Sequence, residues 1–131
     1  MSWSDEEIYL VAQRGYEFAM QGRYELATVL FEGLLAVAPS YIYARRALAA
    51  VQLQTGSAAA AVHTLDGLSA PERDGRSRQL RLEALLALGR FKEANTELAA
   101  ARPYLDARAA RRIGLGIEHG PKQLSGPQPD K

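Results

Sequence analysis

One stretch decides the fold: residues 22–39 read GRYELATVLFEGLLAVAP. From Tyr24 onward its apolar residues recur at offsets of three and four, as on the buried face of an amphipathic helix. A glycine precedes this helix. Pro39 ends it, because proline has no amide proton for the helical hydrogen bonds and disfavours a helical residue before it.

The same punctuation returns twice further along the chain. Gly22, Gly56 and Gly89 are separated by 34 and then 33 residues, and an alanine follows each glycine five positions later. A glycine turn and a small residue in fixed register, repeated at this period, are typical of stacked helix–turn–helix repeats. The sequence therefore predicts an all-α fold built from three helical hairpins.

The predicted elements divide the chain into a helical domain, residues 1–113, and a flexible tail rich in glycine and proline, residues 114–131. We expect repeats at about 5–39, 40–70 and 71–102, with helices over 5–21, 24–37, 40–54, 58–68, 76–88 and 91–101. Pro103 suits a first helical position, where its missing amide proton costs little, and predicts a separate capping helix over 103–113. A repeat array needs a polar end, which Arg108, Arg111 and Arg112 would supply by facing water.

The first predicted helix has two informative features. Ser4 followed three positions later by Glu7 forms a capping box at its start. Gly15 lies in its middle, where glycine costs up to about 1 kcal/mol relative to alanine. This cost indicates that another helix passes close by, and we expect Ala27 to make the contact.

Composition bears on several classes of function. With 16 basic and 15 acidic residues the net charge is +1, which gives no electrostatic reason to expect binding to nucleic acid or to an anionic membrane. The absence of cysteine excludes disulfides, thiol catalysis and thiolate metal sites. No apolar window approaches a membrane span and the N-terminus lacks a signal-peptide pattern, so we expect a cytoplasmic protein without membrane insertion. The many alanines and the excess of arginine over lysine indicate a GC-rich bacterial source.

The sequence shows no catalytic or metal-binding constellation. Acidic residues are spread along helix surfaces, and the glycines at 114 and 116 follow a helix instead of opening one, unlike a phosphate-binding loop. His63 and His119 are the only histidines, and both lack the companion ligands of a zinc site. His63 and Asp66 are interpreted as an exposed helix pair. We therefore expect no enzyme activity, no metal and no cofactor.

With the hairpins placed, the chain resembles the tetratricopeptide repeat (TPR) family over residues 8–103. The small, aromatic and turn positions of the three repeats carry the resemblance: Gly15, Phe18, Gly22, Tyr24, Ala27, Phe31 and Pro39; Ala49, Gly56, Ala61 and Leu65; Leu85, Gly89, Phe91, Ala94 and Leu98. The resemblance implies three TPR-like hairpins stacked as a right-handed superhelix plus a C-terminal capping helix. The second repeat departs from the pattern, since it lacks an aromatic residue after its turn glycine and ends early at Pro71.

A narrower resemblance concerns residues 15–39 and the arginine pair at 45–46. They are similar to the small TPR chaperones of bacterial type III secretion. This similarity implies a chaperone that keeps a translocator or an export component soluble until its export.

In a curved array of this kind the first helix of each hairpin lines the concave side. The repeat register places a partner-binding groove there, formed by Tyr9, Ala12, Tyr16 and Met20; Tyr43, Arg46, Ala50 and Leu53; Arg76, Gln79, Glu83 and Leu86. Tyrosine, arginine and methionine suit such a surface because they combine large contact area with adaptability or a polar group. Alternatively, several of these tyrosines only cover the edge of the core. The TPR clamp for C-terminal carboxylates is disfavoured, because Ala12, Tyr16 and Ala47 stand at its lysine and asparagine places.

Two functional hypotheses lead. The first is an adaptor or chaperone that binds a peptide or helical segment of another protein in the groove. The second is a structural or assembly protein that self-associates, as a homo- or heterodimer, with Trp3 and the run 58–61 as interface candidates. The arginines within 73–81 and 108–112 are expected to form solvated helix faces, with an acidic partner segment as the alternative reading.

Overall fold

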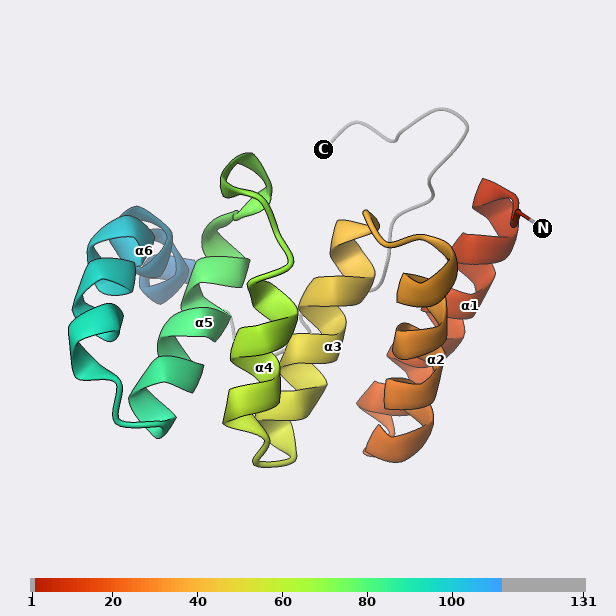
Figure 1. Cartoon of the computed structure of the whole chain (residues 1–131), viewed down its shortest axis with the longest axis horizontal. Helices are drawn as coiled ribbons and strands as arrows, with labels where there is room; N and C mark the ends of the chain where they lie inside the picture. The colour runs from red at the N-terminus through yellow and green to blue at the C-terminus, as the bar shows by residue number, and fades with distance from the viewer. Residues whose placement is uncertain (1, 112–131) are drawn as a thin grey trace.

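The computed structural model describes residues 2–111, which are helical with no strand among them (Figure 1). The elements are α1 (Asp5–Met20), α2 (Tyr24–Val37), α3 (Ile42–Gln54), α4 (Ala58–Leu65), the short 3₁₀ helix η1 (Ala70–Glu72), α5 (Gly75–Ala87) and α6 (Phe91–Arg111). The predicted all-α fold is confirmed. In the first hairpin the bounds agree with the prediction to within one residue, whereas α4 ends three residues early.

The three turn glycines adopt a backbone conformation that other residues rarely reach. Their φ angles are 76° at Gly22, 83° at Gly56 and 73° at Gly89. In this left-handed region a Cβ atom would crowd the backbone, so glycine is strongly preferred. The periodic glycines thus close the hairpins in which α1 packs on α2, α3 on α4 and α5 on α6.

Side-chain caps fix the starts of α1 and α5, each of which is the first helix of its hairpin. At α1 the Ser4 hydroxyl accepts a hydrogen bond from the Glu7 amide at 3.1 Å, and the Glu7 carboxylate accepts one from the Ser4 amide at 2.8 Å. At α5 the Asp74 carboxylate accepts a hydrogen bond from the Ser77 amide at 2.8 Å. These bonds satisfy amides that have no partner within the helix. The predicted capping box is confirmed.

The hairpins stack side by side, α2 against α3 and α4 against α5 (Figure 1). The first helices also touch one another, α1 with α3 and α3 with α5. Within residues 2–111 no comparable contact joins α2 to α4 or α4 to α6. The array therefore curves toward the side formed by α1, α3 and α5.

Two apolar cores hold the stack together, and α3 contributes to both. The first joins α1, α2 and α3 through Ile8, Ala12, Ala19, Ala27, Phe31, Leu34, Ala44, Ala47, Leu48 and Val51. The second joins α3, α4, α5 and α6 through Ala49, Ala50, Ala61, Val62, Leu65, Leu68, Leu80, Leu82, Ala84, Leu85 and Ala94. The small alanine side chains on both sides of α3 allow the helices of both cores to pack closely against it.

Gly15 lies against another helix, as predicted, and its nearest neighbour there is Phe31. A Cβ added to Gly15 would lie 2.8 Å from Cε1 of Phe31, which is fully buried in α2. The nearest atoms are those of the Phe31 ring, one turn further along α2 than Ala27, which is buried in the same core. The absence of a side chain at Gly15 thus leaves room for the Phe31 ring.

The last described helix differs from the prediction. α6 runs without interruption from Phe91 to Arg111 with Pro103 inside it, so no separate capping helix forms. A proline inside a helix removes one hydrogen bond and crowds the preceding turn, which bends the helix. The α6 ribbon in Figure 1 bends in this way. The helix continues past Pro103 because mostly alanine, leucine and arginine follow, which favour helix.

The expected polar end of the array is also only partly realised. Arg108 is buried and donates a hydrogen bond to the Tyr104 hydroxyl at 3.2 Å, instead of facing water. The side chain of Arg111, Arg112 and the predicted tail 114–131 lie outside what the structure describes.

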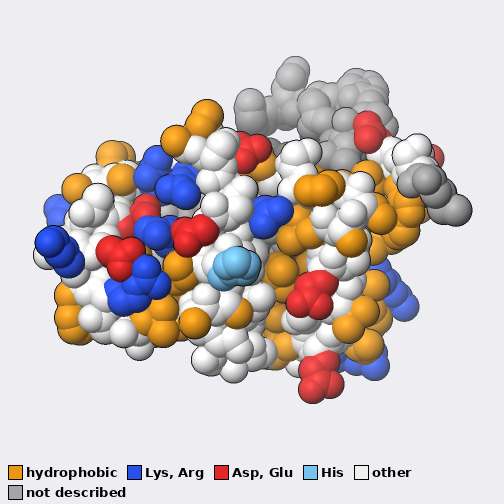
Figure 2. Space-filling model, viewed as in Figure 1, with side chains coloured by type: hydrophobic (Ala, Val, Ile, Leu, Met, Phe, Trp, Pro, Cys, Tyr) orange, Lys and Arg blue, Asp and Glu red, His pale blue; other side chains and the backbone are white. Residues whose placement is uncertain are grey.

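The surface seen in Figure 2 changes character along the array. Charged side chains gather over α5 and α6, where Arg81 pairs with Asp66 at 3.0 Å and Arg90 pairs with Glu93 at 2.7 Å. Apolar side chains are prominent over α1 and α2. On α2 they include the exposed Leu26, Val29 and Val37.

Candidate functional site

The residues assigned to the groove lie on α1, α3 and α5, but at different depths. Tyr9, Tyr16, Tyr43, Arg46, Leu53, Arg76 and Gln79 are half-buried, and Met20, Glu83 and Leu86 are exposed. We call these ten residues the inner face. Ala12 and Ala50 do not belong to it, because both are buried in the cores. The repeat register predicts on which side of the helix these two residues lie, but not how deeply they are buried.

Tyrosines from two repeats meet at one end of the inner face. Tyr41 and Tyr43 lie with ring centroids 5.9 Å apart, and Tyr9 and Tyr16 of α1 are close enough to influence their ionisation. Tyr43 also meets Phe31 edge to face at 6.1 Å, which anchors the group to the first core. Sequence reasoning missed Tyr41: the predicted helix over 40–54 included it without assigning it to the groove, whereas α3 begins at Ile42 and Tyr41 lies just before it.

The hydroxyls of this cluster are not all available. Those of Tyr41 and Tyr43 are buried and have no hydrogen-bond partner among the described residues. Tyr43 therefore agrees in part with the alternative interpretation, in which these tyrosines cover the edge of the core. Burial, and after it the neighbouring Tyr9, raises the pKa of Tyr41 to about 12; burial likewise raises the pKa of Tyr43.

These shifts predict alkaline unfolding. The folded state favours the neutral phenols, so their contribution to stability is present below the ordinary tyrosine pKa of 10.0 and is lost as the pH rises through about 12. We expect tyrosinate absorbance from these two rings to appear together with loss of helical circular dichroism. Replacing both with phenylalanine should move that transition to higher pH; an unchanged midpoint would contradict the assignment.

Charged groups meet at the other end of the inner face, around the start of α5. Arg46 of α3 pairs with Asp74, the residue that also caps α5. Arg76 donates a hydrogen bond to Gln79 at 2.8 Å. Burial, and after it the nearby Arg108, lowers the pKa of Arg76. The last turns of α6 therefore reach the same end of the inner face.

The approach of α6 is fixed by a second glycine contact. A Cβ added to Gly75 would overlap the ring of Tyr104, at 2.3 Å from its Cγ. Tyr104 and Arg108 were not predicted at this site, because the sequence placed them in a separate capping helix. Only the continuous, bent α6 brings them to the first turn of α5.

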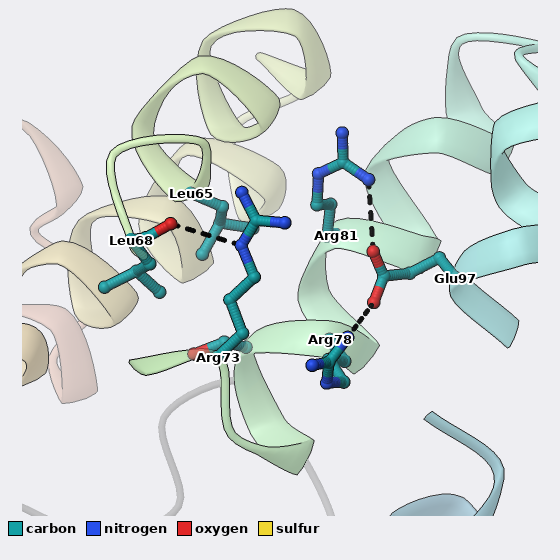
Figure 3. A pocket seen from close by; sticks show the side chains of 7 residues that line it. Leu65, Leu68, Arg73, Arg78, Arg81 and Glu97 are labelled. Carbon is teal, nitrogen blue, oxygen red and sulfur yellow. Dashed lines mark hydrogen bonds and ion pairs between the residues drawn. The ribbon is translucent and has the colours of Figure 1, made fainter. Parts of the chain in front are cut away.

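A side-chain cluster between α4, α5 and α6 surrounds a narrow hollow (Figure 3). Figure 3 shows the Glu97 carboxylate between Arg78 and Arg81, at 3.6 Å and 3.1 Å, while Arg73 donates to the Leu68 carbonyl at 3.2 Å. The hollow is too small for a water molecule. The expectation of a solvated arginine face is wrong here, because these arginines bind a buried carboxylate and a loop carbonyl.

An open cleft of about 270 Å³ lies between the loop after α2 and the loop after α4. The Arg45 guanidinium lies in it and donates hydrogen bonds to the carbonyls of Pro39 at 2.9 Å and Thr64 at 3.3 Å. These bonds tie the loop after α2 to the last turn of α4. Asp66 nearby pairs with Arg81 and so has a partner other than the expected His63.

The inner face brings together aromatic rings, apolar side chains and guanidinium groups from α1, α3 and α5. Among the residues described, no group of three or more histidine, cysteine, aspartate or glutamate side chains is placed to bind a metal ion. Within the same part of the chain, no helix is long and apolar enough to cross a membrane.

Comparison with known proteins gives one match. A model of the tetratricopeptide repeat family matches residues 18–86, just over half of the chain. This span runs from the end of α1 into α5 and includes the glycine turns at Gly22 and Gly56. No curated protein and no solved structure matches the chain.

Proposed function

We propose that this chain, which belongs to the tetratricopeptide repeat family, binds a segment of another protein across its inner face. Repeats of this family generally mediate protein–protein interaction and are not typically enzymatic. The observation that carries the proposal is the continuous surface of α1, α3 and α5, on which apolar and aromatic side chains lie beside charged ones without being covered by α2 or α4. Such mixed surfaces provide binding anchors.

Within this surface we assign different roles to the two ends. Met20 and Leu53, at the C-terminal ends of α1 and α3, provide adaptable apolar contact, and Arg46 and Arg76 provide hydrogen-bond donors for backbone carbonyls or acidic side chains of the partner. Each of these side chains keeps access to solvent. An extended or helical segment that crosses from α1 to α5 would contact both ends.

A matched pair of substitutions tests the proposal. Met20 on the inner face and Val29 on α2 are both apolar and similarly exposed, at 56% and 63%. A peptide selected from a random library against the wild-type chain serves as the probe. We expect Met20→Asp to weaken its binding at least about tenfold, since a charged group would enter an apolar contact. Val29→Asp should change the affinity less than about twofold.

The reverse pattern would contradict the proposal, and so would a failure of both variants to affect a peptide that binds tightly. Neither substitution lies in a core, so unfolding is not expected to confuse the comparison. Circular dichroism of both variants provides the control for folding.

One observation favours the second hypothesis, self-association. Leu26, Val29 and Val37 form an exposed apolar stripe on α2, whereas the register-matched positions of α6 for the first two, Glu93 and Thr96, are polar. Trp3 is also exposed, but Ala61 of the other proposed interface is fully buried and cannot contribute. In light scattering, a dimer abolished by Val29→Asp but not by Met20→Asp would favour self-association through α2.

A narrower version of the proposal makes this protein a cytoplasmic chaperone of bacterial type III secretion, with a translocator or export component as partner. Its support is the resemblance of residues 15–39 together with the small size of the array. Co-expression with such a partner should then give a stable complex on gel filtration, and a partner that stays soluble and separate would count against it.

A further inference from the structure

We propose that the outward side of α2 is a second binding surface, and that it takes an amphipathic helix of another protein with basic residues along one edge. This surface faces away from the first core and does not include the inner face, so it is independent of the function proposed above. It is formed by the apolar stripe of Leu26, Val29 and Val37 together with two glutamates beside it.

The helix α2 is apolar on both of its sides. One side is buried in the first core, and the apolar stripe lies on the opposite side, exposed. A helix at the surface of a protein normally carries polar residues opposite its buried side, and a helix that is apolar all round is normally covered on all sides. An apolar surface of this kind marks a place where another molecule binds.

The repeat fold does not itself require this stripe. At its first two positions the other hairpins carry Ala60 and His63 in α4, and Glu93 and Thr96 in α6. A Cβ added to Gly33, which lies within the stripe, would meet no atom within 4 Å, so the space outside this part of α2 is open. The large apolar side chains of the first hairpin are therefore not explained by packing within the described part of the chain.

Two carboxylates define the charge of this surface. Glu25 and Glu32 are both exposed and lie seven residues apart, which places them on the same edge of the stripe, about 10 Å from each other. Neither forms an ion pair with another described residue. Figure 2 shows acidic side chains among the apolar ones over α2. The surface therefore complements a helix with an apolar stripe and with lysine or arginine seven residues apart beside it.

A second copy of this chain complements the surface less well. A two-fold dimer joins the same patch of both molecules. Since α2 contains no lysine or arginine, two stripes in contact would gather the glutamates of both helices and no cation from either. Like charges at a contact oppose association, whereas a basic helix supplies the opposite charge.

The test uses the full chain and a fluorescent peptide of about 16 residues, long enough to form a helix on binding. The peptide carries a stripe of leucines and two lysines seven residues apart along one edge, and the control peptide carries glutamates in place of these lysines. In fluorescence anisotropy we expect the lysine peptide to bind at least about tenfold more tightly, because repulsive pairs replace attractive ones in the control. The preference should shrink as salt is added.

Two pairs of substitutions locate the charge preference. Glu25→Gln with Glu32→Gln should remove most of the preference for the lysine peptide. Glu6→Gln with Asp106→Asn removes the same charge from exposed positions of α1 and α6 and should leave the preference unchanged. Equal losses in the two double variants would overturn the proposal, since the preference would then reflect only the net charge of the protein.

Two further pairs locate the apolar contact. Leu26→Ser with Val29→Ser should weaken binding of the lysine peptide at least about tenfold, because two apolar contacts are lost. Leu88→Ser with Phe91→Ser is the matched control, since these side chains are 39% and 64% exposed against 40% and 63% in the stripe. The control should change the affinity less than about twofold. None of the four residues belongs to a core, and circular dichroism checks that both variants fold.

Three results would overturn the proposal. The first is equal binding of the two peptides. The second is binding that Met20→Asp weakens and the stripe variant does not, which would place the peptide on the inner face. The third is a dimer in light scattering that the stripe variant abolishes and the peptide does not dissociate, which would assign the stripe to a second copy of this chain.

Discussion

Replacing Phe31 with alanine is expected to lower the free energy of unfolding by about 3–5 kcal/mol. Phe31 is fully buried in the first core, its ring fills the space beside Gly15, and it meets Tyr43 edge to face. Alanine would leave a cavity that joins α1, α2 and α3, and a rigid helix packing cannot collapse to fill it. Urea denaturation followed by circular dichroism measures the loss.

Two further substitutions test whether Gly15 and Phe31 are coupled in their effect on the free energy of unfolding. Phe91→Ala, at a phenylalanine that is 64% exposed, should cost less than about 0.5 kcal/mol and is the matched control. Gly15→Ala places a Cβ 2.8 Å from the ring and should cost about 1–3 kcal/mol, with a smaller cost when Phe31 is already leucine. Additive costs would show that Gly15 and Phe31 are not coupled.

The parts of the fold that could be predicted are those where one residue type satisfies a local requirement. A positive φ at Gly22, Gly56 and Gly89 needs glycine, so the turns were visible in the sequence as a period. The partner of Gly15 was not visible, because a glycine indicates a close approach without specifying which side chain approaches. Pro103 was ambiguous for a similar reason, since proline is compatible both with a helix start and with a bend inside a helix.

The inner face could be predicted only in part. The helical period predicts which side of each helix faces the groove, and Tyr9, Tyr16 and Arg46 are half-buried residues of α1 and α3. Depth depends on how closely the next helix packs, so Ala12 and Ala50 were placed on the surface but are buried in the cores. Tyr41 and Tyr104 were missed because the predicted helix bounds were wrong. Tyr41 precedes α3 instead of lying within it, and Tyr104 belongs to the continuous α6 and not to a separate helix.

Glu97 shows most clearly what the pattern of residues left hidden. In the sequence it is one more acidic residue on a helix, yet its carboxylate is only 5% exposed and lies between Arg78 and Arg81. Arg81 also pairs with Asp66 at the C-terminal end of α4, so one network links α5 and α6 to the end of α4. Although burial opposes it, the hydrogen bonds that Arg81 donates to Asp66 and Glu97 raise the pKa of Arg81 above its ordinary value.

We therefore expect Glu97→Ala to lower the free energy of unfolding by about 2–4 kcal/mol, because two arginines would lose the carboxylate that compensates them. This loss is smaller than is usual for breaking a fully buried ion pair, since both arginines keep some contact with water. Glu93→Ala removes an exposed ion pair from the same helix and should cost less than about 1 kcal/mol. Replacing Arg78 and Arg81 with methionine together with Glu97→Leu should recover most of the loss, because no charge is then left buried without a partner. Equal costs for Glu97→Ala and Glu93→Ala, measured by urea denaturation, would show that the buried carboxylate does not stabilise the packing of α6 on α5.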